Sequence, residues 1–189
     1  ASIEVRKKLT ADDVWQMIQS GELDTHATFF ELIEGEIVEV PPSSGDGSAT
    51  GVNITGPLWA FARVAGGKVF DASGGFLVRA DHRQLRAADA AYIGPARAQA
   101  SYPRWVDGAP DLAVEVLSEG QYGPAYAQGK VSEYFEAGAQ LAWLLDRRHK
   151  EVRVHRANAD EYTIYRNDAV LTLEPIIAGF ELKVSDIFR

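Results

Sequence analysis

The chain has 189 residues, no cysteine and a formal net charge of −8, with 46% hydrophobic and 24% charged residues. This composition is typical of a globular domain with a substantial core, and it excludes a disulfide framework and a thiolate metal site. The acidic charge argues against broad, non-specific nucleic-acid binding, although a local basic groove remains compatible with it.

No apolar run approaches the roughly 20 residues that cross a bilayer, and no signal segment is visible. We therefore expect a cytoplasmic protein that makes no membrane contact. The length fits a single domain over residues 1–189. Within it, we expect residues 1–28 to form an N-terminal helical segment and residues 29–189 to form the core.

The N-terminal part of the chain predicts a helix followed by a β-hairpin. Thr10 can cap a helix with an acidic first turn, and Gly21 can end that helix. Apolar residues then alternate on either side of a Glu34-Gly35 turn, which predicts a hairpin over residues 29–40.

A loop and a second helix are expected next. Residues 41–51 are rich in Pro, Ser and Gly, which predicts a loop. The spacing of apolar residues over 52–64 predicts a helix, which Pro57 should kink or delay. Gly66 and Gly67 should end it.

Three short strands and one basic segment follow. Residues 68–72 and 75–79 predict two strands, and residues 88–93 predict a third that opens with Asp89. The segment Arg79–Arg86 is basic, with three arginines and one histidine against Asp81 alone. It is interpreted either as a solvated loop or as a contact for phosphate groups.

The most strand-like run is residues 109–118, Ala-Pro-Asp-Leu-Ala-Val-Glu-Val-Leu-Ser. One face of this strand is wholly aliphatic, whereas the other carries Asp111 and Glu115. A buried carboxylate is costly unless a cation pairs with it. Lys130, in a predicted helix over residues 126–137, is the candidate cation.

The C-terminal third predicts further strands. Residues 141–145, 152–154 and 162–165 have the pattern of an antiparallel meander. Residues 170–188 consist of short apolar pieces that we expect to close the core.

Distance decides how the carboxylates can pair. Asp111 and Glu115 are four residues apart in a strand, so their Cα atoms lie roughly 13 Å apart. A metal ion binds oxygen at about 2.0–2.5 Å, so these two cannot comfortably share one ion. Glu115 therefore needs a carboxylate from a neighbouring strand, for which Asp89 is the best choice, and Asp111 can instead fix the loop before the strand.

Two interpretations of this group remain open. In the first, Asp89, Glu115 and Lys130 form one metal-dependent site in which the ammonium orients a water molecule. In the second, Glu115 and Lys130 are a structural ion pair and Asp89 is a surface residue. Other chemistries have less support, because no nucleophile elbow or Walker-type loop occurs and the histidines show no ligand spacing.

With these residues in place, the chain resembles the Uma2 (DUF820) family of predicted endonucleases, which belongs to the PD-(D/E)XK nuclease superfamily. The resemblance runs from about Phe30 to Phe188, and it rests on the order and spacing of several short segments rather than on any single motif. These segments are Glu31-Leu-Ile-Glu-Gly-Glu36, residues 109–118, Lys130 with Tyr134 and Gly138, Trp143-Leu-Leu-Asp146, Ile177-Ala-Gly-Phe-Glu-Leu182 and Asp186-Ile-Phe188.

The resemblance implies an α/β (α+β) fold of the restriction-endonuclease type, with a mixed central sheet flanked by helices. It also implies a Mg²⁺ (or Mn²⁺) phosphodiesterase site in which Asp89 and Glu115 match the two acidic positions of the motif. Leu117 stands where many nucleases of the superfamily have Lys, so Lys130 would supply that amine. Glu31 matches a further acidic position and would be an additional metal ligand.

The leading hypothesis is therefore a Mg²⁺-dependent endonuclease that cleaves DNA, with a homodimer as a further expectation from the family. An alternative is a binding or interaction module that has kept the fold and lost the chemistry, because Ala88 and Glu119 replace residues common in the family. A third is a sugar hydrolase with two carboxylates about 5–10 Å apart across an open cleft and no Lys between them.

Overall fold

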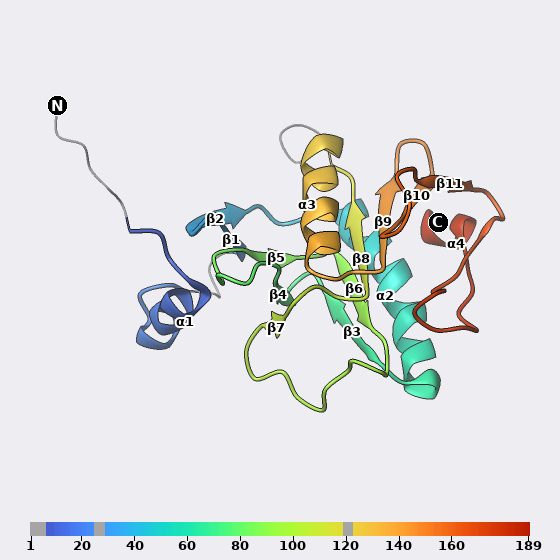
Figure 1. The fold of residues 1–189 in the computed structure, drawn as a ribbon. Coiled ribbons are helices and arrows are strands. Elements are labelled where there is room, and N and C mark those ends of the chain that lie inside the picture. The colour runs from blue at the N-terminus through green and yellow to red at the C-terminus, as the bar shows by residue number, and fades with distance from the viewer. Residues whose placement is uncertain (1–6, 25–28, 119–122) are drawn as a thin grey trace.

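The structure is a computed structural model that describes residues 7–24, 29–118 and 123–189 (Figure 1). The helices are α1 (Ala11–Ser20), α2 (Gly45–Ala65), α3 (Pro124–Glu136) and α4 (Val184–Ile187). The strands are β1 (Phe29–Ile33), β2 (Glu36–Val40), β3 (Lys68–Asp71), β4 (Gly75–Leu77), β5 (Leu85–Ala87), β6 (Ala90–Ile93), β7 (Val106–Asp107), β8 (Leu112–Val116), β9 (Leu141–Asp146), β10 (Glu151–Arg156), β11 (Thr163–Arg166), β12 (Val170–Leu171) and β13 (Leu182–Lys183).

The strands form mixed sheets flanked by helices, as predicted. One sheet has five strands in the order β2-β1-β5-β4-β7, and a second has six in the order β11-β10-β9-β8-β6-β3. Each contains one parallel pair, β4 with β7 and β8 with β9, among antiparallel neighbours. None of the described helices is long and apolar enough to span a bilayer.

The first helix and the hairpin agree with the sequence. Thr10 caps α1 in a reciprocal arrangement with Asp13, and Gly21 ends it with a φ of 77°. The β1–β2 hairpin turns at Glu34 and Gly35, which both have positive φ, as a tight two-residue turn requires. Parts of the expected 1–28 segment, residues 1–6 and 25–28, lie outside the described residues, as do residues 119–122 of the loop after the central strand.

The predicted loop over residues 41–51 is wrong in its second half, because α2 already begins at Gly45. The Ser44 side chain caps it by accepting a hydrogen bond from the Gly47 N–H at 3.1 Å. Pro57 therefore lies inside the helix and does not delay its start. The helix tolerates the missing N–H of proline because Ile54 and Leu58 are fully buried against the six-stranded sheet.

The central strand lies where its pattern predicts. β8 pairs with β6 on one side and with β9 on the other. Leu112 and Val114 pack with Ile54 and Leu58 of α2, so the aliphatic face meets that helix. α3 packs on the opposite face of the same sheet, over Ala142 and Leu144 of β9 (Figure 1). Glu115 therefore faces α3.

The C-terminal part also agrees with the sequence. β9, β10 and β11 form the predicted antiparallel meander. The segment after it closes the core, since Leu173 and Phe180 are buried and the Phe180 ring lies 6.4 Å from that of Trp143. The two strands predicted at 68–72 and 75–79 exist, but β3 pairs with β6 and β4 with β5, so they belong to different sheets.

Replacing Gly67 by Ala should destabilise the fold. Gly67 has a φ of 96°, and a Cβ there would lie 2.5 Å from the Tyr92 hydroxyl oxygen and 2.6 Å from the Ile93 carbonyl oxygen. We expect Gly67→Ala to lower the free energy of unfolding by about 1–3 kcal/mol. The matched control, Gly129→Ala on the open face of α3, should raise it by up to about 1 kcal/mol. Urea denaturation measures both, and equal effects of the two variants would contradict the prediction.

Candidate active site

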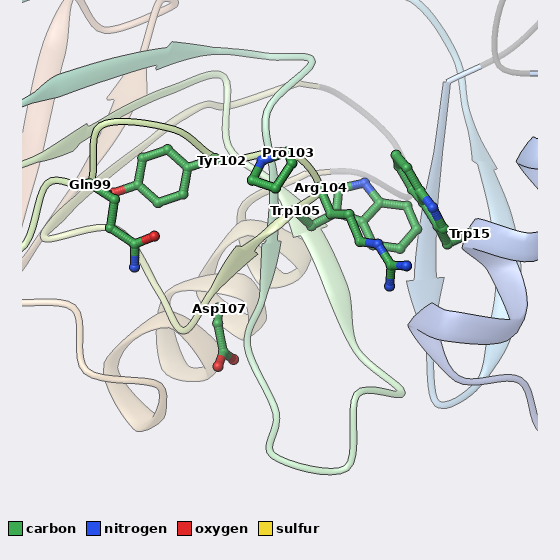
Figure 2. Close-up of a pocket in the computed structure, with 7 residues that line it drawn as sticks. All are labelled: Trp15, Gln99, Tyr102, Pro103, Arg104, Trp105 and Asp107. Atoms are coloured by element: carbon green, nitrogen blue, oxygen red, sulfur yellow. The ribbon is translucent and has the colours of Figure 1, made fainter.

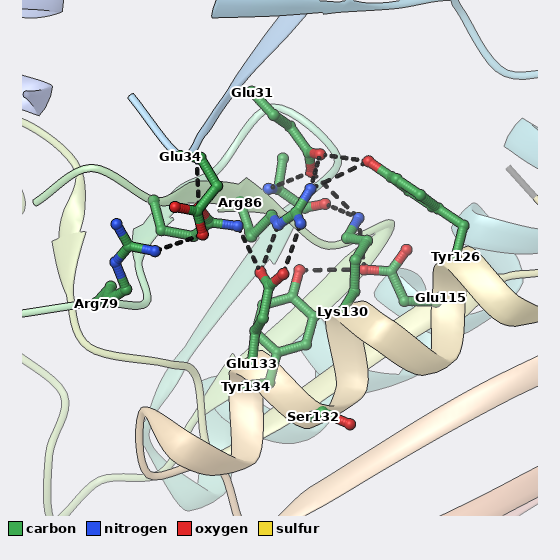
Figure 3. A network of polar contacts seen from close by, with 12 residues as sticks. Glu31, Glu34, Arg79, Arg86, Glu115, Tyr126, Lys130, Ser132, Glu133 and Tyr134 are labelled. Carbon is green, nitrogen blue, oxygen red and sulfur yellow. Dashed lines mark hydrogen bonds and ion pairs between the residues drawn. The ribbon is translucent and has the colours of Figure 1, made fainter. Parts of the chain in front are cut away.

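Lys130 is the centre of the candidate site (Figure 3). It projects from α3 and is buried, at 6% exposure. Its ammonium Nζ lies 2.8 Å from Glu115 Oε1 and 3.2 Å from Glu31 Oε1, and it donates a hydrogen bond to the Ala87 carbonyl at 2.7 Å. Burial favours the neutral amine, but these carboxylates outweigh that effect and raise the pKa of Lys130, so the side chain stays charged.

Glu31, the acidic residue at the N-terminal end of the core, is held by several donors at once. Its Oε2 accepts hydrogen bonds from Arg86 Nη1 and the Tyr126 hydroxyl, each at 2.8 Å. Its Oε1 accepts the Ala87 backbone N–H at 3.1 Å and faces Lys130. Burial acts to raise the pKa of Glu31, but Lys130 and Arg86 outweigh it and hold the pKa below its usual value.

Arg86 belongs to the candidate site, although the sequence analysis did not assign it. The basic segment that contains it was interpreted as a solvated loop or a phosphate contact, but the Arg86 side chain points inward and is 4% exposed. It contacts Glu31, and it makes two further hydrogen bonds to Glu133 of α3, at 2.6 and 2.7 Å. Glu133 also accepts a hydrogen bond from Gln84. The guanidinium, which β5 carries, therefore connects β1 with α3.

Asp89 and Glu115 lie on neighbouring chain segments. Since Ala90 pairs with Val114 in the antiparallel ladder, the same register continued by one residue places Asp89 across from Glu115, on the same face of the sheet. Asp89 Oδ2 accepts the backbone N–H of Val116 at 2.6 Å. The structure thus brings together all four residues predicted for the site.

Few donors and cations offset the negative charges of Asp89 and Glu115. Burial raises the pKa of Glu115 to about 7, and burial also raises the pKa of Asp89. Glu115 Oε1 forms an ion pair with Lys130 Nζ at 2.8 Å and accepts a hydrogen bond from the Tyr134 hydroxyl at 3.1 Å. Among the described residues, no hydrogen bond reaches Glu115 Oε2 or Asp89 Oδ1. The cluster contains two cations, Arg86 and Lys130, against four carboxylates, Glu31, Asp89, Glu115 and Glu133, so two negative charges have no matching cation when all four carboxylates are ionised.

Asp111 has a structural role outside this site. Its Oδ2 accepts the Gly94 backbone N–H at 2.8 Å, and its Oδ1 lies 2.6 Å from Arg97 Nη1. The sequence analysis expected Asp111 to fix the loop before β8, whereas the backbone N–H that it accepts belongs to Gly94, directly after β6.

A second group of metal-type ligands lies at the end of β9. Asp146, His149 and Glu151 place ligand atoms within 4.8 Å of one another. The histidine spacing in the sequence did not reveal this group, because the strand pairing of β9 with β10 creates it. Its carboxylates are already paired, however: Arg153 contacts both, and Arg166 contacts Glu151.

A hollow between α1 and the segment before β7 is separate from the acidic cluster (Figure 2). Trp15 and Trp105 meet there edge to face at 5.6 Å, and the Arg104 guanidinium lies 5.2 Å from the centre of the Trp15 ring. None of the residues of the Lys130 cluster lines it. The full lining is Trp15, Gln99, Tyr102, Pro103, Arg104, Trp105 and Asp107.

The comparisons with known proteins agree with this architecture. A family model named Uma2, with the description "Putative restriction endonuclease", matches residues 15–185. The chain belongs to the Uma2 family. The Uma2 chain is also similar to a crystal structure from Anabaena variabilis described as "a putative nuclease belonging to DUF820", with a TM-score of 0.72 and 20% identity over 91% of this chain and 96% of that one. At this identity the likeness shows the fold alone. No curated protein matches the sequence.

The spacing of one helical turn that places Tyr134 on the same face as Lys130 could also have found Tyr126 and Glu133, which the sequence analysis did not assign. Tyr126, Glu133 and Tyr134 are four residues before, three after and four after Lys130. Residues with these spacings share one face of a helix, so all three project toward the same cluster as the ammonium (Figure 3). No comparable signal marks Arg86, since the strand that carries it is only three residues long.

Removing the Arg86 guanidinium should be far more costly than removing that of Arg79. We expect Arg86→Met to lower the free energy of unfolding by about 3–5 kcal/mol, because the buried Glu31 and the Glu133 carboxylate lose their shared cation. Arg79, at the other end of the same basic segment, pairs with Glu34 at the surface, so Arg79→Met should cost about 0–1 kcal/mol. Urea denaturation at neutral pH tests the pair, and similar losses would show that Arg86 is not a central cation.

The raised pKa of Glu115 predicts a pH effect on stability. Because the folded state holds this proton more tightly than the unfolded state does, the stability that Glu115 contributes is fully present below its ordinary pKa of 4.5 and is lost as the pH rises through about 7. From about pH 5 to about pH 8, the parent should lose about 2–3 kcal/mol relative to Glu115→Gln, which cannot titrate. Urea titrations of both proteins across this range give the difference. A constant difference would mean that Glu115 is already ionised at pH 5.

Proposed function

We propose that this Uma2 protein is a Mg²⁺- or Mn²⁺-dependent endonuclease that hydrolyses phosphodiester bonds of DNA. The observation that carries the proposal is the charge imbalance around Lys130. Burial raises the pKa values of Asp89 and Glu115 because their ionised forms have no matching cation, and hard divalent cations bind such oxygen ligands. A divalent cation would balance the cluster.

Asp89 and Glu115 fit the role of metal ligands. Each has one carboxylate oxygen without a hydrogen bond from the described residues, and they lie across from each other on one sheet face. The ligand role of Glu31 stays a prediction, and its four donors suggest instead that it holds Lys130 and Arg86 in place. When bound, the ion would polarise the phosphate and lower the pKa of a water molecule.

Lys130 would act in this proposal as a fixed positive charge. An ammonium has three N–H donors, and all three have a partner here: Glu115, Glu31 and the Ala87 carbonyl. Its raised pKa makes it a poor base at neutral pH. Lys130 would orient the attacking water by exchanging its longest contact, the one to Glu31, for that water.

Two alternatives are separated by specific observations. The sugar hydrolase required two carboxylates with no Lys between them, whereas Lys130 contacts both Glu31 and Glu115. The non-catalytic binding module is still supported by one observation. All three N–H groups of Lys130 have a partner, as they would in a purely structural ion pair. A metal titration distinguishes this alternative from the nuclease.

The remaining parts of the proposal concern location and assembly. Since DNA is the proposed substrate and the chain has no cysteine, we place the protein in the cytoplasm. A homodimer is proposed from the family resemblance.

The decisive test is thermal melting with Mg²⁺ or Mn²⁺, beside nicking of supercoiled plasmid. At ten times the dissociation constant, a bound ion should stabilise the parent by about 1.4 kcal/mol, which raises Tm by about 3–5 °C. Glu115→Gln should lose both the Tm rise and the nicking, because it removes a ligand. Lys130→Gln should keep a Tm rise above its own metal-free value but lose the nicking, because it removes only the fixed charge.

Glu181→Gln, an exposed carboxylate on the segment before β13, is the matched control and should behave as the parent does. If neither metal raises the Tm of the parent and no nicking occurs, the non-catalytic binding module replaces the nuclease. If Glu115→Gln retains both properties, the metal site lies elsewhere.

A further inference from the structure

The β9–β10 turn is the most basic exposed segment beside the candidate active site. It reads Arg147-Arg148-His149-Lys150 and joins the end of β9 to the start of β10. Since β8 and β9 are parallel, with Glu115 paired to Leu144, the turn lies at the C-terminal end of these two strands, where Glu115 also lies. Figure 1 shows this end of the strands at the top, where the first turn of α3 also lies.

The start and the interior of this turn are held by specific contacts. At its start, Arg147 contacts Asp46 at 2.9 Å and the Ser44 hydroxyl at 3.4 Å, both at the beginning of α2. Within it, Asp146 accepts the His149 backbone N–H at 3.1 Å and faces the His149 ring at 2.8 Å. Burial acts to raise the pKa of Asp146, but hydrogen bonds from His149 outweigh it and keep the carboxylate ionised. A ligand would therefore meet a turn that is already ordered.

Two cations of the turn point into solvent. Arg148 and Lys150 are exposed, and within the described part of the chain neither is in an ion pair. The surrounding group is basic in a chain with a net charge of −8. Its cations are Arg147, Arg148, Lys150, Arg153 and Arg166, and its carboxylates are Asp46, Asp146 and Glu151.

The neighbouring group of Asp146, His149 and Glu151 does not explain this surface as a metal site. Arg153 and Arg166 already neutralise its carboxylates, and Asp146 is needed to hold the turn. These contacts instead leave the basic side chains outermost, which suits a polyanion.

We infer that Arg148 and Lys150 bind backbone phosphates of duplex DNA beside the cleavage position. This inference rests on the proposed function, whose substrate it places on the surface. Arg148 is four residues beyond Leu144, which pairs with Glu115, and residues 147–150 form a turn, so the Cα atoms of Arg148 and Glu115 lie at most about 14 Å apart. That distance corresponds to at most about four base pairs along a duplex, so the turn would contact the backbone within a few nucleotides of the bond that is cut. Binding of single strands uses stacking on aromatic rings as well, and the turn offers no Phe, Tyr or Trp.

The test measures DNA binding without cleavage. Fluorescence anisotropy of a labelled duplex of mixed sequence, in EDTA and at several NaCl concentrations, gives the slope of log K against log[salt]. Arg148→Gln/Lys150→Gln should weaken binding and make this slope shallower by about 1.8, since each lost phosphate contact removes about 0.9. The matched control, Lys68→Gln/Lys183→Gln, removes two exposed charges on β3 and β13 and should keep the slope of the parent.

Each outcome decides the inference separately from the nuclease proposal. If the parent does not bind the duplex, or if both double variants change the slope equally, the inference is overturned. If a labelled single strand binds the parent more tightly than the duplex does, the assigned ligand is wrong. If the slope change is found but plasmid nicking with metal is absent, the turn is a DNA contact of a non-catalytic binding protein and only the nuclease proposal fails. Unchanged Tm values of both double variants confirm that folding is not the cause.

Discussion

The contact on which the structure depends most is the buried ammonium of Lys130. It joins α3 to both large sheets, because Glu31 and the Ala87 carbonyl belong to the five-stranded sheet and Glu115 belongs to the six-stranded one. Removing one partner of such a buried ion pair leaves an uncompensated charge in a medium of low dielectric constant. The same interaction therefore helps to assemble the fold and defines the candidate active site.

Two glutamates contact this ammonium, and their surroundings move their pKa values in opposite directions. Glu31 also binds Arg86 and Tyr126, and its pKa is lowered. Glu115 shares a face with Asp89, and its pKa is raised to about 7. Such a separation of neighbouring carboxyl groups is typical of sites with distinct chemical roles. It supports a structural role for Glu31 and a ligand role for Glu115.

The arginines show why sequence position alone does not assign a basic residue. The segment Arg79–Arg86 carries three arginines and a histidine, yet Arg86 is internal and Arg79 is paired with Glu34 and Asp81. The shorter run at the β9–β10 turn has two exposed cations. Because β8 and β9 are parallel, this run lies at the same end of the strands as Glu115. The contacts of Arg86 and the position of the β9–β10 turn both depend on segments distant in sequence, so local composition does not reveal them.

The sequence by itself determined the elements whose signals are local. It predicted the capped helix at Thr10, the 29–40 hairpin, the alternation of the central strand and the Lys130 helix, because caps, turns and periodicity act over a few residues. It also paired Glu115 with Asp89 and Lys130, since a buried carboxylate requires nearby partners. Only the tertiary structure decided that Arg86 turns inward onto Glu31 and Glu133, and that the basic turn after β9 lies at the same end of the sheet as Glu115. Those outcomes depend on burial and on contacts between residues far apart in the chain, and local sequence patterns contain neither.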